Sequence, residues 1–131
     1  MFIYLDTAIV IYAIEGVPAF RTRALARLLA AHHAGDDLVT SDLTRSECLV
    51  KPLRTADPQL RADYLTFLDQ TLVVGHDAAI FDEMTAIRAA NNYNIPDALH
   101  LATAVRNGCG VFLTNDNRLA GFGQIAVELL P

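Results

Sequence analysis

The stretch PDALHLATAVRNGCGVFLTND, residues 96–116, decides the fold class of this chain. Pro96 has the preset φ of a helix start, and Gly108 stands where a helix ends in a left-handed residue. Between them, helical spacing gives the predicted helix one buried face: Ala98, Leu101, Ala102 and Val105. The apolar run Val111–Thr114 then predicts a short buried strand. A helix that leads directly into an apolar strand is typical of a parallel α/β sheet.

The rest of the chain repeats this alternation. Four further short apolar runs predict strands: Phe2–Leu5, Leu38–Thr40, Leu72–Val74 and Ala126–Leu129. Helical spacing of apolar residues occurs in three segments between them: 24–29, 60–68 and 80–87. Asp57 ahead of Pro58 predicts one helix start, and Asp77 predicts another. We therefore predict a three-layer α/β/α sandwich with a central parallel sheet, whose strand order the sequence leaves open.

Length and composition predict one soluble domain over residues 1–131. The chain is 53% hydrophobic and 19% charged, which argues against disorder. Its longest wholly apolar run, Ala8–Ile14, is far shorter than the roughly 20 residues of a membrane span, and the start MFIYLD lacks the basic segment of a secretory signal. Cys48 and Cys109 stand apart from each other and from any zinc-ligand pattern, so we expect reduced, buried thiols and a cytoplasmic protein.

Four acidic residues follow or precede the predicted strands. Asp6 comes directly after FIYL, and Asp116 follows VFLT after a single Asn. The carboxyl ends of parallel strands meet at one edge of the sheet, so these two side chains should lie at the same edge. Asp97 begins the helix before the strand Val111–Thr114, and Glu47 lies in a helical segment shortly after Thr40. A tertiary fold could bring all four together.

Such a cluster would need a cation or a proton, because two like charges about 4 Å apart repel by about 4 kcal/mol at an effective dielectric of 20. An oxygen-only donor set selects Mg²⁺ or Mn²⁺ rather than zinc. An ion of this kind can generate a hydroxide nucleophile for phosphodiester hydrolysis, which suggests nuclease chemistry. Each acid also has a structural alternative: Asp6 and Asp97 could be turn formers or helix caps, Asp116 could belong to a turn, and Glu47 could be solvated. The residues alone leave both interpretations open.

Four segments of the chain resemble the PIN-domain ribonucleases, and specifically the VapC-type toxins of bacterial toxin–antitoxin modules. The segments are LDT (residues 5–7), RSECL (45–49), PDALHLATA (96–104) and TNDNRL (114–119). The resemblance covers essentially the whole chain and places Asp6, Glu47, Asp97 and Asp116 on the four acids of the family. It implies a Mg²⁺- or Mn²⁺-dependent endoribonuclease in which the three aspartates hold metal. Glu47 would bind metal or position the attacking water. The hydroxyls of Thr7 and Thr114 would support the metal-binding acids from behind.

The resemblance also implies partners. Family members typically form homodimers and are silenced by a small cognate antitoxin whose tail enters the acidic groove. The complex binds operator DNA only through the antitoxin. A basic tail could replace metal as the counter-charge of clustered carboxylates, which gives this expectation a physical basis. Asn117 stands where some relatives carry a further acid, so the number of metal ions stays open.

Other charged residues near these motifs have two interpretations each. His100, three residues after Asp97, could orient an acid, contact RNA, or be a structural histidine. The bases around Glu47 could approach an RNA backbone or simply be solvated: Arg45, Lys51 and Arg54.

Two other enzyme classes with acids at strand ends lack necessary residues here. A response-regulator receiver needs a lysine after a late strand, but the only lysine is Lys51. A haloacid-dehalogenase-type phosphatase needs a second acid two residues after the first, where this chain has Ala8. A PIN nuclease of RNA processing without an antitoxin, and a non-catalytic PIN-like binding module, remain alternatives.

Overall fold

The computed structural model describes residues 1–131, which form five strands and six α-helices. The strands are β1 (Phe2–Leu5), β2 (Asp37–Ser41), β3 (Leu72–Val74), β4 (Val111–Thr114) and β5 (Ala126–Leu129). The helices are α1 (Thr7–Glu15), α2 (Pro18–His33), α3 (Asp42–Arg54), α4 (Pro58–Leu68), α5 (Ala78–Ala90) and α6 (Ile95–Arg106). A single 3₁₀ turn, η1 (Asn117–Leu119), follows β4. All five predicted strands are present within a residue or two.

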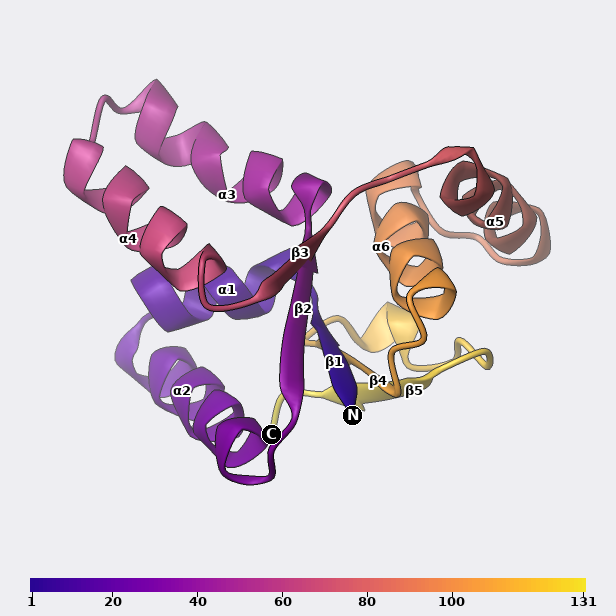
Figure 1. The fold of residues 1–131 in the computed structure, drawn as a ribbon, viewed down its shortest axis with the longest axis horizontal. Coiled ribbons are helices and arrows are strands. Elements are labelled where there is room, and N and C mark those ends of the chain that lie inside the picture. The colour runs from indigo at the N-terminus through magenta and orange to yellow at the C-terminus, as the bar shows by residue number, and fades with distance from the viewer.

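The sheet is parallel throughout, with the strand order β3-β2-β1-β4-β5. Helices α1 to α4 cover one face, and α5 and α6 cover the other (Figure 1). The predicted three-layer α/β/α sandwich is therefore confirmed. The chain builds outward from β1 to β3 and then returns to place β4 on the other side of β1. This reversal makes the carboxyl ends of β1 and β4 the point where parallel α/β sheets usually bind ligands.

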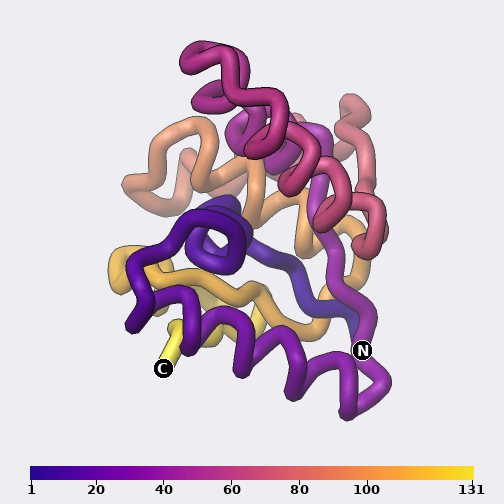
Figure 2. The backbone as a smooth tube through the Cα atoms, turned by 90° about the vertical axis from the view of Figure 1, so that its left-hand side faces the viewer, coloured from indigo at the N-terminus to yellow at the C-terminus, as the bar shows by residue number.

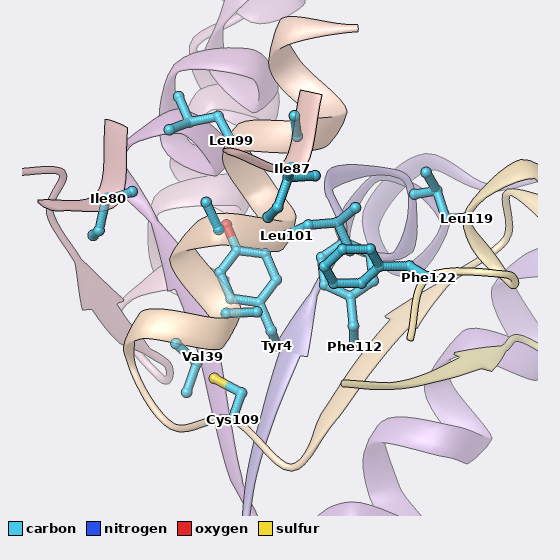
Figure 3. Close-up of a cluster of buried hydrophobic side chains, with 13 residues drawn as sticks. Tyr4, Val39, Ile80, Ile87, Leu99, Leu101, Cys109, Phe112, Leu119 and Phe122 are labelled. Atoms are coloured by element: carbon cyan, nitrogen blue, oxygen red, sulfur yellow. The ribbon is translucent and has the colours of Figure 1, made fainter. Parts of the chain in front are cut away.

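Alternating side chains of the central strands supply the two cores. Tyr4 and Phe112 lie in the core beneath α5 and α6, where their rings stack with centroids 5.4 Å apart (Figure 3). Ile3, Leu5 and Leu113 point to the opposite face and pack under α1 to α4. Successive residues of a strand face opposite sides of the sheet, so a strand that is covered on both sides must be apolar throughout. This requirement explains the short, continuous apolar runs.

Several local predictions are also confirmed. The Asp57 and Asp77 side chains cap α4 and α5 by accepting a hydrogen bond from the backbone N–H of the third residue of each helix. Gly108 has a φ of 69° just after the end of α6, as a left-handed helix stop requires. The start of α6 differs slightly from the prediction, because Asn94 caps it and Ile95, one residue before Pro96, is already helical.

Helix α1 was not among the predicted elements. It begins directly after Asp6, so the one residue between β1 and α1 caps the helix. Figure 2 shows the face of the molecule that α1 to α4 cover, with α2 running along its lower part and the α3–α4 hairpin above it. Both cysteines are free and buried, as expected, and no helix is long and apolar enough to cross a membrane.

Candidate active site

An open cavity of about 580 Å³ lies at the carboxyl ends of β1 and β4. Three of the four predicted acids line it: Asp6, Asp97 and Asp116. They come from the end of β1, the first turn of α6 and the segment after β4. The register of the sheet explains the first and last, because Leu5 pairs with Leu113 and the two strands therefore end side by side. The rest of the lining is Ala8, Tyr12, Asn115, Asn117 and Arg118.

Asp6 is held firmly at the base of this cavity. Its backbone N–H donates to the Leu113 carbonyl at 2.9 Å, which continues the pairing of β1 with β4. One carboxylate oxygen accepts the Thr7 backbone N–H at 2.9 Å, and the other accepts the Thr114 hydroxyl at 2.7 Å. The same Thr114 oxygen accepts the backbone N–H of Asp116 at 3.1 Å. Thr114 therefore ties the two aspartate-bearing segments together.

Asp97 and Asp116 share a single cation, the guanidinium of Arg118. Its Nη2 atom lies 3.1 Å from Asp97 Oδ2 and 2.5 Å from Asp116 Oδ2. The pKa of Asp116 is lowered by these hydrogen bonds from Arg118. The pKa of Asp97 is raised, first by its partial burial and then by the negative charge of Asp6, against the opposing effect of Arg118. The cavity thus contains more negative charge than one guanidinium offsets.

The donor chemistry fits a hard divalent cation, although the side chains do not form a closed coordination shell. The lining contains carboxylate, amide and hydroxyl oxygens but no histidine or cysteine, and oxygen donors are what Mg²⁺ and Mn²⁺ prefer. No three acidic, histidine or cysteine groups converge as metal ligands in the present arrangement. A divalent ion would have to compete with Arg118 for Asp97 and Asp116.

Glu47, the fourth predicted acid, lies beside this cavity rather than in its lining. Its Oε1 atom accepts the Thr7 hydroxyl at 2.7 Å and His100 Nε2 at 2.6 Å. Burial raises the pKa of Glu47, but the hydrogen bonds from His100 and Thr7 outweigh this effect, so the pKa is lowered overall. Thr7 immediately follows Asp6 in the chain, so Glu47 is connected to the cavity through a single residue.

His100 continues this hydrogen-bonded network into the core. Its side chain is only 2% exposed. Nδ1 lies 2.7 Å from the Tyr4 hydroxyl, which is also 2.8 Å from Ser41 Oγ. Of the interpretations considered for His100, both a structural histidine and one that orients an acid fit this arrangement, because its outer nitrogen contacts Glu47 and its inner nitrogen contacts Tyr4.

The bases near Glu47 in sequence do not line the cavity. The Lys51 ammonium pairs with Glu15 Oε1 at 2.6 Å, on a neighbouring surface. Arg45 lines a separate shallow depression on α3, and Arg54 is exposed at the end of that helix. The cation that does reach the acids is Arg118. Sequence reasoning missed it, although it lies two residues after Asp116 in the quoted segment TNDNRL.

A comparison with protein-family models matches residues 3–125 to the PIN domain. The chain belongs to the PIN-domain family. This match covers all six helices and four of the five strands, and it ends just before β5, so the family and the fold predicted from the sequence are both confirmed. A search of curated proteins gave no match.

Solved structures of toxin–antitoxin proteins share this PIN fold. VapBC2 from Rickettsia felis, bound to a promoter DNA fragment, gives a TM-score of 0.84 at 16% identity, with all of both chains covered. DNA-bound VapBC from Salmonella typhimurium gives 0.83 at 19% identity and covers 100% of this chain and 99% of that one. VapC20 from Mycobacterium tuberculosis, a sarcin-ricin loop cleaving toxin, gives 0.72 at 18% identity over 95% and 98%. At these identities the likeness establishes a shared fold.

Proposed function

We propose that this PIN domain is a Mg²⁺- or Mn²⁺-dependent endoribonuclease and the toxin of a VapBC-type module. The observation that carries the proposal is the convergence of Asp6, Asp97 and Asp116 from distant parts of the chain around one open cavity. Acids at three element ends would not need to meet if each were only a cap or a turn former. Their meeting produces a negative site that favours a cation.

Each of these acids and its supporting groups would have a separate role in such a site. Asp6, Asp97 and Asp116 would hold the ion, and Glu47 would bind it or position the attacking water. When bound, the ion supplies an activated water for attack on the RNA phosphodiester. Thr114 fixes the Asp6 carboxylate at one side of the cavity, and Thr7 and His100 fix Glu47 beside it. The hydrogen bonds of these supporting groups limit the rotation of Asp6 and Glu47 before any substrate arrives.

The toxin role brings further partners into the proposal. The similar structures include VapBC complexes, two of which are bound to DNA. We expect a small cognate antitoxin that inserts a basic tail into the acidic cavity, a homodimer of this chain, and binding of operator DNA through the antitoxin. A small upstream reading frame for a DNA-binding protein would distinguish this role from RNA processing without an antitoxin.

The decisive experiment compares RNA cleavage by the wild type and by Asp6→Asn and Asp97→Asn variants, in EDTA and in Mg²⁺ or Mn²⁺. We expect cleavage by the wild type only with metal, and loss of cleavage in both variants. Asp82→Asn, the same change at an exposed acid on α5, should keep full activity and serves as the matched control. Equal cleavage by all four proteins would remove the catalytic assignment of Asp6 and Asp97, whereas RNA binding without cleavage by the wild type in Mg²⁺ or Mn²⁺ would favour a non-catalytic binding module. For an active wild type, sequencing of cellular RNA ends after brief induction would identify the target.

A further inference from the structure

Arg118 is the one positively charged side chain that lines the acidic cavity. Its guanidinium donates through Nη2 to the carboxylates of Asp97 and Asp116, and its Nε atom also donates to Asp116 Oδ1 at 3.0 Å. These are the only salt bridges that Asp97 and Asp116 make. The guanidinium therefore takes up acceptor positions on two of the three acids proposed to bind metal.

The side chain of Arg118 is free to leave, while its backbone is not. The side chain is 68% exposed, whereas those of Asp97 and Asp116 are 18% and 28% exposed. The Arg118 backbone N–H donates to Asp116 Oδ1 at 2.9 Å, and the next residue, Leu119, is fully buried in the core. Rotation of the side chain would release the guanidinium without disturbing the fold and would keep it at the rim of the cavity.

The charge of the site determines when this release occurs. A divalent ion and a guanidinium repel each other, and both need the oxygens of Asp97 and Asp116. Once these carboxylates are engaged by metal, the guanidinium loses both partners and needs another anion within reach. The anion that the proposed reaction brings to the same cavity is an RNA phosphate, which a guanidinium can bind through two parallel hydrogen bonds.

We propose that Arg118 is an RNA-phosphate-binding residue of this site, held on Asp97 and Asp116 until a divalent ion displaces its guanidinium from these carboxylates. The inference rests on the proposed nuclease function and adds a substrate contact to it. It makes metal binding and RNA binding interdependent, because the same exchange that admits the ion makes the guanidinium available to the phosphate.

The first test measures Mn²⁺ binding to the purified protein by calorimetry and electron paramagnetic resonance. Removal of the competing guanidinium in Arg118→Ala should tighten Mn²⁺ binding by about threefold or more. Arg106→Ala, which removes one positive charge at the far end of α6, is the control for net charge and should bind Mn²⁺ as the wild type does. Arg118→Lys, which keeps the charge but loses the planar fork, should lie between the wild type and the alanine variant.

The second test measures binding of a fluorescein-labelled single-stranded RNA, in EDTA and in Ca²⁺, with gels to verify that the RNA stays intact. In EDTA, Arg118→Ala and the wild type should bind RNA equally, because the guanidinium is occupied. In Ca²⁺ the variant should bind about three- to tenfold more weakly, and the dependence of binding on salt should fall by about one phosphate contact. Tighter metal binding together with weaker RNA binding is not expected from a merely structural role.

The outcomes separate this inference from the proposed function. If Asp6→Asn and Asp97→Asn lose Mn²⁺ binding and RNA cleavage while Arg118→Ala behaves like Arg106→Ala, the inference is wrong and the nuclease stands. An equal loss of RNA binding in EDTA and in Ca²⁺ would also overturn it, since Arg118 would then contact RNA without any exchange. If the wild type neither binds Mn²⁺ nor cleaves RNA, the proposed function itself fails.

Discussion

Replacement of Thr114 by valine should loosen the aspartate-lined cavity at a measurable cost in stability. Thr114 is fully buried, and valine has nearly the same shape but no hydroxyl. The hydroxyl donates to the Asp6 carboxylate at 2.7 Å and accepts the Asp116 backbone N–H at 3.1 Å. Valine removes both hydrogen bonds at once and leaves Asp6 with only the backbone N–H of Thr7.

The two lost hydrogen bonds set the size of the effect. A hydrogen bond to a charged group contributes about 1.5–3 kcal/mol, and a neutral one about 0.5–1.5 kcal/mol. Both acids are partly exposed, so water can replace some of this energy, and we expect a net loss of about 2–3 kcal/mol. For a domain of this size, such a loss lowers Tm by roughly 6–12 °C.

Urea unfolding followed by circular dichroism, in EDTA at neutral pH, measures this loss. Thr103→Val is the matched control, because Thr103 is equally buried but its hydroxyl donates only to the Leu99 carbonyl inside α6. That change should cost less than about 1 kcal/mol, since such a hydroxyl adds little to a carbonyl of the helix ladder. A Thr114→Val protein as stable as Thr103→Val would refute the reasoning that Thr114 joins the two aspartate segments.

Three further predictions concern single ionisable groups. The pKa of Asp97 is raised in the folded state, so its ionised form destabilises the fold. Without metal, Asp97→Asn should therefore unfold at a higher urea concentration than the wild type near pH 7. The difference should shrink as the pH falls towards the pKa of an ordinary Asp. A constant difference would contradict this. The pKa of Glu47 is lowered, so its contribution to stability is present above the pKa of an ordinary Glu and is lost as the pH falls through its pKa in the folded protein. In the same unfolding assay, Glu47→Gln should be less stable than the wild type near pH 7 and should approach the stability of the wild type at acidic pH. Burial raises the pKa of Cys48 to about 12 and that of Cys109 to about 11, so neither thiol should react with a disulfide reagent at pH 8 until urea unfolds the protein, and rapid reaction of the native protein would show that a thiol is accessible.

The strands and layers could be predicted because the covered sheet imposes a strong pattern. Each central strand must be apolar on both faces, and such runs stand out between helices with one apolar side. Helix α1 escaped prediction for the same reason: its segment Ala8–Ile14 is apolar all round, so it has no periodicity to distinguish helix from strand. Helix α6 is buried on more sides than predicted, with Leu99 and Thr103 also covered, because it packs against both the sheet and α5.

The aspartates of the site could be anticipated, but their partners could not. Asp6 and Asp116 follow strands, so the shared edge of a parallel sheet could be predicted for them. Their closeness also depends on the pairing of β1 with β4, which the sequence left open. Glu47 and Arg118 lie on segments whose side chains reach the site only after the whole chain is folded. The position of Glu47 in its helix does not predict its contacts with Thr7 and His100. The position of Arg118 in the chain likewise does not predict its contact with Asp116. These choices depend on distances between elements that local sequence does not encode.

The two partners of the acids in this site differ in how permanently they are bound. His100 holds Glu47 from within the core, is fixed in turn by Tyr4, and has no room to move. Arg118 holds Asp97 and Asp116 from the solvent side and can be replaced. An acid that must keep one orientation is best served by a buried partner, whereas acids that must receive an ion need a partner that can leave. The site therefore combines a fixed side with an exchangeable side, and the exchangeable side is where the proposed function places metal, RNA and a basic antitoxin tail.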